Sequence, residues 1–137
     1  SQETGSVASI GYVEEGISTM VQYVPAEKVI NAVPFYTRIW ETGAEGVKSQ
    51  AVGMTTAEDF LAQRGIEPVW DEETCQNYAE FEEDGAFFQV WLENEQSLQA
   101  KLQVMEQYGI GGVAAWKLGY EAGHPEVWAV ISDFAAG

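Results

Sequence analysis

The stretch GIGGVAAWKLGY, residues 109–120, decides the fold. It is too short for an amphipathic helix, and its apolar residues do not alternate with polar ones as in a half-exposed strand. Apolar runs without alternation are typical of parallel sheets, in which both faces of a strand are covered. We therefore predict a strand over residues 111–116 that is covered on both faces and ends in the large side chain of Trp116.

A second strand of the same kind is predicted within KVINAVPFYTRIW, residues 28–40. Its apolar core covers residues 29–33, and Pro34 indicates that regular pairing weakens there, near the end of the strand. The polar and aromatic residues that follow are expected at or just past the C-terminal end of this strand: Tyr36, Arg38 and Trp40.

Helices are predicted wherever apolar residues recur at helical spacing or helix-ending signals occur. These stretches are residues 10–21, 55–65, 94–109 and 124–135. For the short second helix, the sequence predicts a cap at Thr55 or Thr56 and an end at Gly65. His124, the single histidine, is expected on the surface at the start of the last helix.

The segment between the first strand and the third predicted helix, residues 41–93, is predicted to contain antiparallel strands in addition to the short second helix. Residues 41–53 are predicted to form a loop. Antiparallel strands are then expected from the apolar residues at 68–73, 77–83 and 86–92, with a hairpin turn at Asp84-Gly85. The chain is therefore predicted to be an α/β protein in which two helix–strand units flank a hairpin-rich insertion. Because two parallel strands make a poor sheet, the sequence indicates part of a larger domain.

Composition narrows the class of function. The chain has 22 acidic and 6 basic residues among 137, with a formal net charge of −16. Nucleic acid is excluded as a partner because phosphate binding needs clusters of Lys and Arg. No apolar run is long enough to predict membrane insertion. A single cysteine, Cys75, excludes an internal disulfide and a cysteine-rich metal site, and we expect neither a metal nor a cofactor.

Two long motifs resemble glycoside hydrolase family 18. VASIGYVEEGISTMVQYVPAEKVINAVPFYTRIW, residues 7–40, is similar to the run after the sixth barrel strand, which leads to a Pro-Phe-Tyr-Gly-Arg-like motif. WLENEQSLQAKLQVMEQYGIGGVAAWKLGY, residues 91–120, is similar to the last helix–strand unit, with an acid–Ser–Lys helix and a Trp that closes strand eight. Thr37 stands where many members have Gly.

The resemblance implies the C-terminal fragment of a TIM (β/α)8 barrel. Residues 1–40 would form barrel helix six and strand seven, residues 41–93 an α+β insertion, and residues 94–137 helix seven, strand eight and helix eight. Active sites of such barrels lie at the C-terminal ends of the strands. Among members, the sequence looks closest to chitinase-like enzymes of the bacterial spore cortex and cell wall.

The resemblance also implies a binding site for sugars. Trp116 matches the family's Trp that forms the floor under the sugar, and Tyr36 and Arg38 match the Tyr and Arg that contact it. Two alternatives remain open: Trp116 as a plug in the core, and Arg38 paired with a structural carboxylate. The remaining tryptophans of this region are expected to pack inside the insertion rather than to extend the cleft: Trp40, Trp70 and Trp91.

The family's acid motif, Asp-x-x-Asp-x-Asp-x-Glu, occurs nowhere in the 137 residues, so we expect no catalytic residue in this chain. The parent enzyme is expected to hydrolyse β-1,4-linked N-acetylglucosamine glycans, chitin or peptidoglycan, with retention and with the substrate's acetamido group as nucleophile. It would act outside the cell or at the cell wall or spore. The fragment alone is expected to be inactive and to self-associate.

Two other functions stay open at this point. One is a non-catalytic, chitinase-like protein that binds glycans. The other is a free-standing α+β domain unrelated to sugars, whose buried strands would need a cover such as a second copy of the chain.

Overall fold

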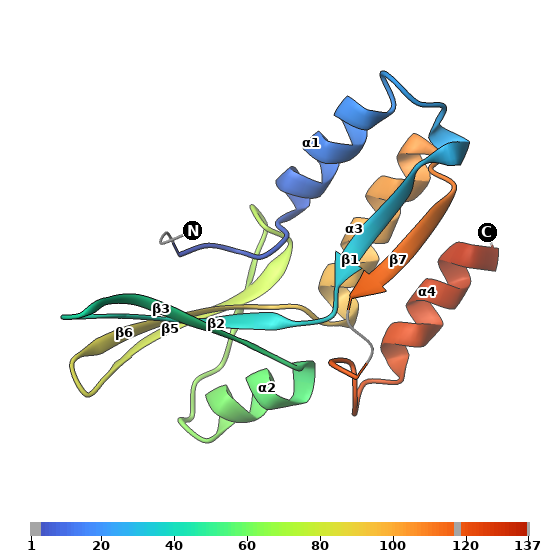
Figure 1. The fold of residues 1–137 in the computed structure, drawn as a ribbon. Coiled ribbons are helices and arrows are strands. Elements are labelled where there is room, and N and C mark those ends of the chain that lie inside the picture. Colours follow the sequence, from blue (N-terminus) through green and yellow to red (C-terminus); the bar gives the residue numbers. More distant parts are fainter. Residues whose placement is uncertain (1–3, 117–118, 137) are drawn as a thin grey trace.

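The computed structural model describes residues 4–116 and 119–136 and contains two separate β-sheets (Figure 1). The first sheet is a parallel pair, β1 (Ile30–Pro34) and β7 (Gly112–Trp116). The second is antiparallel, in the order β3-β2-β6-β5-β4. Its strands are β2 (Thr37–Gly43), β3 (Gly46–Val52), β4 (Val69–Asp71), β5 (Gln76–Glu83) and β6 (Ala86–Leu92).

The helices are divided between the two sheets. α1, α3 and α4 pack against one face of the parallel pair, whereas α2 lies against the five-stranded sheet (Figure 1). All four predicted helices are confirmed to within a few residues. They are α1 (Ile10–Met20), α2 (Met54–Ala62), α3 (Glu95–Tyr108) and α4 (Glu126–Ala136), and a short 3₁₀ helix, η1 (Ala26–Lys28), precedes β1.

The parallel pair has one covered face, which forms the larger core. Val33 of β1 is 1% exposed, and Val113 and Ala115 of β7 pack on the same core. The helices contribute much of this core through side chains that are 5% exposed or less, among them Val13, Ile17, Met54, Leu98, Leu102, Met105 and Val127. The predicted α/β arrangement, with two parallel strands far apart in the sequence, is confirmed.

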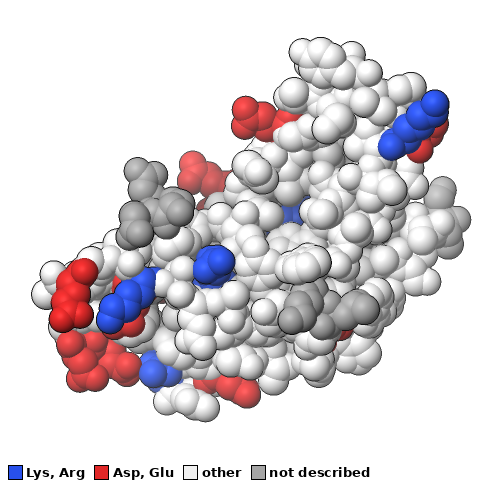
Figure 2. Space-filling model, viewed as in Figure 1, with Lys and Arg blue, Asp and Glu red and all other residues white. Residues whose placement is uncertain are grey.

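The other face of the pair is bare, so the prediction that both faces are covered is wrong for the described chain. Ile30 is 69% exposed and Trp116 65%, and Ala32 and Ala114 between them are also exposed. Figure 2 shows almost no charged side chains on the surface over β1 and β7. Because both faces of these strands are apolar, the sequence pattern could not tell which one the helices cover.

A close approach of two backbones explains the glycines before β7. A Cβ on Gly111 would lie 2.0 Å from the carbonyl oxygen of Glu27, which no side chain can tolerate. The Gly111 N–H donates to the carbonyl oxygens of Ala26 (3.1 Å) and Val29 (2.9 Å). The start of β7 is therefore held against η1 and the first residue before β1.

The five-stranded sheet corrects one prediction and confirms another. The predicted loop over residues 41–53 is wrong, because β2 and β3 form a hairpin in which Thr37 pairs with Val52 and Gly43 with Gly46. β3 is an edge strand with mostly exposed side chains, so it lacks the apolar alternation that reveals a strand. The three predicted antiparallel strands are confirmed as β4, β5 and β6.

The predicted cap of α2 is also wrong. Gly53 is the N-cap residue and has no side chain to bond the helix start. Instead, the Met54 N–H donates to the carbonyl oxygen of Tyr120 (2.7 Å), and the Thr55 hydroxyl donates to that of Ala122 (2.8 Å). A segment distant in sequence therefore replaces the local cap.

A buried ion pair connects the two sheets where β6 ends and α3 begins. Lys101 Nζ lies 2.6 and 2.8 Å from the two carboxylate oxygens of Glu93, and both side chains are 1% exposed. Ser97 and Gln76 donate to the same carboxylate at 2.6 and 3.2 Å, and the Glu93 N–H donates to the Thr37 hydroxyl at 2.9 Å. Burial raises the pKa of Glu93, and Lys101 acts in the opposite direction.

We expect Lys101→Met to destabilise the protein by about 3–5 kcal/mol, because it leaves a buried carboxylate without its counter-charge. Urea unfolding followed by circular dichroism measures the loss. Lys28→Met is the control, since Lys28 is exposed and its substitution should change the free energy of unfolding by less than about 0.5 kcal/mol. Equal effects of the two variants would show that the ion pair does not stabilise the fold.

Candidate functional site

The register of the parallel pair brings two strand ends together. Pro34 and Trp116, the last residues of β1 and β7, are directly paired. The Phe35 N–H donates to the carbonyl oxygen of Trp116 at 2.5 Å, which extends the pairing by one residue. Tyr36 and Arg38 follow immediately in the chain, so the residues predicted from the sequence lie beyond the same end of the pair.

Trp116 presents its ring at this end. Its side chain is 65% exposed, which is unusual for the largest apolar residue at the end of a strand. Trp116 thus lies on the bare face of the pair together with Ile30, so in the described part of the chain it plugs no core. That it forms a sugar platform stays a prediction. Phe35 is fully buried, and its ring makes an edge-to-face contact with Trp128 of α4 at a centroid distance of 5.5 Å.

Tyr36 and Arg38 lie close to each other. The guanidinium carbon of Arg38 is 5.9 Å from the centre of the Tyr36 ring, within the range of a cation–π contact. Arg38 Nη1 donates to the Ser49 hydroxyl at 2.8 Å. Across residues 4–116 and 119–136 the ion pairs do not include Arg38, so the alternative of a structural carboxylate partner is not realised there. A guanidinium has five N–H donors, and this bond uses one of them.

Tyr120 belongs to the same site and was missed by the sequence reasoning. Its ring centre lies 5.8 Å from that of Tyr36, with the planes inclined by 57°. Its carbonyl oxygen accepts the Met54 N–H, so the segment after β7 is tied to α2. The sequence contains a signal for Tyr120, because Tyr120 follows the end of β7 as Tyr36 follows the end of β1, and side chains that follow neighbouring parallel strands lie at one end of the sheet.

His124 ties the same segment to α2 a second time. Its Nδ1 lies 2.7 Å from Glu126 Oε1, and its Nε2 contacts Glu58 on α2. The side chain is 13% exposed, so His124 is partly covered at the surface, and it precedes the last helix as predicted. A hydrogen bond with its own backbone N–H, and then His124, lower the pKa of Glu126.

The part of the chain that the structure describes shows no cluster of metal ligands. In the described ranges, no group of three or more His, Cys, Asp or Glu side chains could hold an ion. Residues 4–116 and 119–136 also include no helix with the length and apolar character needed to cross a bilayer. Lys117 and Leu118, which follow Trp116, lie outside the described residues.

Comparison with protein families identifies the chain. A family model for glycosyl hydrolases family 18 matches residues 2–121. The chain belongs to glycosyl hydrolase family 18. The family resemblance predicted from the two end motifs is confirmed, and the alternative of a domain unrelated to this family is wrong.

Relatives and solved structures in family 18 agree with this assignment. The cortical fragment-lytic enzyme of Bacillus anthracis is 27% identical over 131 residues, which cover 93% of this chain and 30% of the relative. A crystal structure of a chitinase from Chromobacterium violaceum is 26% identical, with a TM-score of 0.85 over 99% of this chain and 42% of that one. The spore cortex-lytic enzyme SleL of Bacillus megaterium has the same fold, with a TM-score of 0.83 and 24% identity over 96% of this chain and 31% of its own.

This chain covers only a part of its family 18 relatives. It spans about 30% of the length of the curated relative from Bacillus anthracis. The mixed α/β fold is therefore that of a part of a family 18 domain.

The lowered pKa of Glu126 predicts a loss of stability in acid. A carboxyl whose pKa is lower in the folded state stabilises the fold above its unfolded pKa, and this contribution is lost as the pH falls through the folded value. We expect the melting temperature to fall more steeply between about pH 5.5 and about pH 3 for the wild type than for Glu126→Gln.

The matched control for this acid titration is Glu67→Gln, which removes one exposed carboxyl elsewhere on the surface. Its melting curve should keep the wild-type slope. If Glu126→Gln and Glu67→Gln give the same slope, His124 and the start of α4 do not stabilise the Glu126 carboxylate.

Proposed function

We propose that this chain forms one wall of the glycan-binding cleft of a family 18 glycosidase that acts on β-1,4-linked N-acetylglucosamine polymers. The observation that carries the proposal is the parallel register of β1 and β7, which ends both strands together and leaves Trp116 exposed there. Membership of family 18 supports the substrate class.

In this proposal, β1 and β7 are strands seven and eight of a (β/α)8 barrel. α1, α3 and α4 would be helices six, seven and eight, and the five-stranded sheet with α2 would be the insertion. The parallel pairing, the helices on one face and the nearly uncharged bare face support this assignment, because barrels carry helices outside and apolar side chains inside (Figures 1 and 2). Residues 1–40 and 94–137 would then belong to the barrel and residues 41–93 to the insertion, although β2 crosses the boundary at residue 40.

Each site residue has a role suited to its chemistry. The exposed ring of Trp116 would form a flat apolar floor under a sugar ring. The Arg38 guanidinium and the Tyr36 hydroxyl would bond hydroxyl and acetamido oxygens, and the contact of Arg38 with Tyr36 holds both groups in place.

The proton donor would come from outside this chain. No stretch of the sequence matches the family's acid motif, so the proposed chain binds the glycan and contributes no catalytic acid. In the whole enzyme, the acetamido group of the substrate would act as nucleophile and one Glu as acid and then base, with retention at the anomeric carbon. The names of the relatives, cortical fragment-lytic enzymes, support a peptidoglycan substrate and a location at the spore or cell wall.

A second candidate function is glycan binding without hydrolysis. The observation that favours it is the same absence of the acid motif from these residues. Assays on a protein that also carries the strand-four segment separate the two, since turnover of N-acetylglucosamine oligomers occurs only in the enzyme.

We expect the purified chain, kept monomeric by Ile30→Lys at the opposite end of β1 from the site, to bind chitohexaose, the hexamer of N-acetylglucosamine, without cleaving it. General acid–base catalysis typically contributes about 100–10,000-fold, and the donor is missing from the sequence. Mass spectrometry of the oligomer detects cleavage, and calorimetry measures binding. Trp116→Ala should weaken binding about tenfold, whereas Tyr23→Ala, a change of an aromatic residue that is 80% exposed after α1, should leave it unchanged. Equal affinities of the two variants would contradict the proposed site.

We also propose that the isolated chain self-associates through the bare face of the β1–β7 pair. An uncharged apolar sheet face with free edges recruits other chains. Light scattering at micromolar concentrations should show a dimer, and Ile30→Lys should convert it to a monomer because Ile30 is 69% exposed on this face. Val69→Lys, at a residue 71% exposed on β4, should not do so. A wild-type monomer over the whole concentration range would overturn the proposal.

A further inference from the structure

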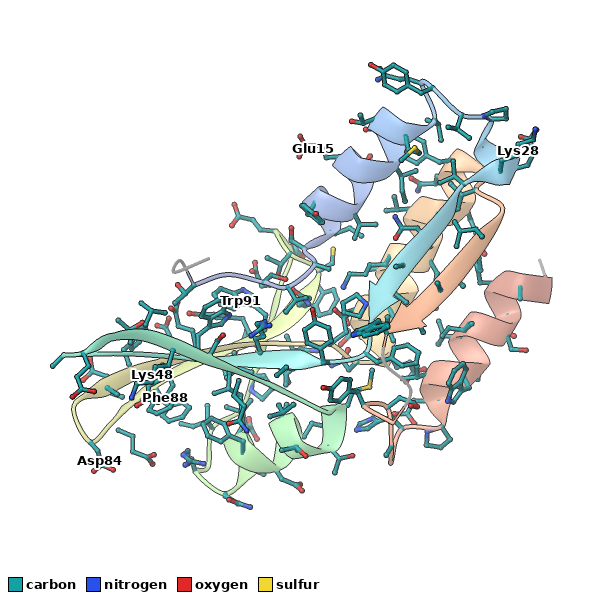
Figure 3. The ribbon with its side chains drawn as sticks, in the orientation of Figure 1. Glu15, Lys28, Lys48, Asp84, Phe88 and Trp91 are labelled. Carbon is teal, nitrogen blue, oxygen red and sulfur yellow. The ribbon has the colours of Figure 1, made fainter. Side chains whose placement is uncertain are left out.

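The five-stranded sheet has two faces, and α2 covers only one of them. Ala57 and Leu61 of α2 pack in the smaller core with Ile39, Ala79 and Val90 of the sheet. Neighbouring residues along a strand point to opposite faces, so the residues next to these belong to the other face. Figure 3 shows Trp91 and Phe88 on opposite sides of the sheet, with Phe88 on the side of α2.

We name the side opposite α2 the aromatic face. The strand register places its members side by side on β2, β6 and β5: Trp40 pairs with Gln89, Gln89 with Glu80, and Trp91 with Tyr78. It consists of Arg38, Trp40, Tyr78, Glu80, Gln89 and Trp91.

Tyr78 and Trp91 form a fixed pair at the centre of the aromatic face. Their ring centres are 4.8 Å apart and the planes are inclined by 46°. The Tyr78 hydroxyl donates to Glu80 at 2.6 Å and accepts from the Gln89 amide at 2.9 Å. Burial, and then Glu80, raise the pKa of Tyr78, which keeps the hydroxyl protonated. These side chains are therefore held in position before any ligand arrives.

The aromatic face is continuous with the site at the strand ends. Arg38 belongs to it through its position on β2 and also contacts the Tyr36 ring at 5.9 Å. Trp40, on the same face of β2, is 8% exposed, and its indole N–H donates to the Gly5 carbonyl at 2.8 Å. Trp40 is thus part of the support, whereas Trp91 and Tyr78 remain partly exposed.

We propose that Trp91, Tyr78 and Gln89 form a second glycan subsite, which binds an N-acetylglucosamine unit of the same polymer that lies on Trp116. This inference rests on the proposed function. Partly exposed rings offer apolar surface to the C–H face of a sugar, and the Gln89 amide and Glu80 carboxylate offer bonds to its hydroxyl groups. The N-acetylglucosamine unit that binds here is uncharged, which suits this face because Glu80 and the net charge of −16 would repel an anionic group.

Indole N–H signals test the subsite in the intact chain. The protein has five tryptophans, and each gives one indole signal in a nitrogen–proton NMR spectrum, assigned by single Trp→Phe variants. On titration with chitohexaose we expect the Trp91 signal to move with saturation. The Trp70 signal should stay in place, since Trp70 pairs with Asn77 and Asn77 with Leu92, a member of the α2 core.

Affinity measurements add a matched pair of variants. Trp91→Ala should weaken chitohexaose binding about tenfold, and Trp70→Ala, the same change on the opposite face of the sheet, should leave it within about twofold. If Trp91→Ala does not fold, the titration of the wild type decides alone, because it needs no truncated side chain.

The outcomes separate this inference from the proposed function. If the Trp116 signal moves while Trp91 stays in place, the second subsite is wrong and the proposed site at the strand ends stands. If neither signal moves, both are overturned. If Trp91 and Trp70 move equally, the response is not specific to the aromatic face and the subsite is wrong.

Discussion

The ion pair between Glu93 and Lys101 holds the two halves of this structure together. It lies where the last strand of the five-stranded sheet passes into α3, the helix beneath the parallel pair, and neither side chain is more than 1% exposed. Two buried charges are costly to desolvate, and they are tolerated here because Ser97 and Gln76 complete the hydrogen bonding of the carboxylate. Such a network has one acceptable geometry and therefore fixes how the sheets meet.

That geometry reaches the candidate site through Thr37. The buried Thr37 hydroxyl accepts the Glu93 N–H, and Thr37 stands between Tyr36 and Arg38 in the chain. The positions of Tyr36 and Arg38 thus depend on an ion pair that touches neither of them. The other side of the site is fixed by α2, whose Met54 N–H and Thr55 hydroxyl bond the segment that carries Tyr120. The five-stranded sheet and α2 consequently support the candidate site.

The sequence predicts the parts of this structure that are set by local or periodic signals. Leu98, Leu102 and Met105 recur at helical spacing and are buried in α3. The largely apolar stretches of β1 and β7, which do not alternate with polar residues, indicate parallel strands, with Tyr36 just past the end of one and Trp116 at the end of the other. What it misses depends on distant partners. β3 is an exposed edge strand without alternation, the start of α2 is capped by Tyr120, and His124 is partly covered by its contact with Glu58 of another element.

The pairing of β1 with β7 has a consequence for how the chain folds. All of residues 35–111 lie between the two strands, so their pairing closes a long loop at a large cost in conformational entropy. The hairpins β2–β3 and β5–β6 join neighbouring segments and need no such closure. We expect the five-stranded sheet to form first and to bring the ends of β1 and β7 toward each other. A segment outside the parallel pair would then be the nucleus on which that pair assembles.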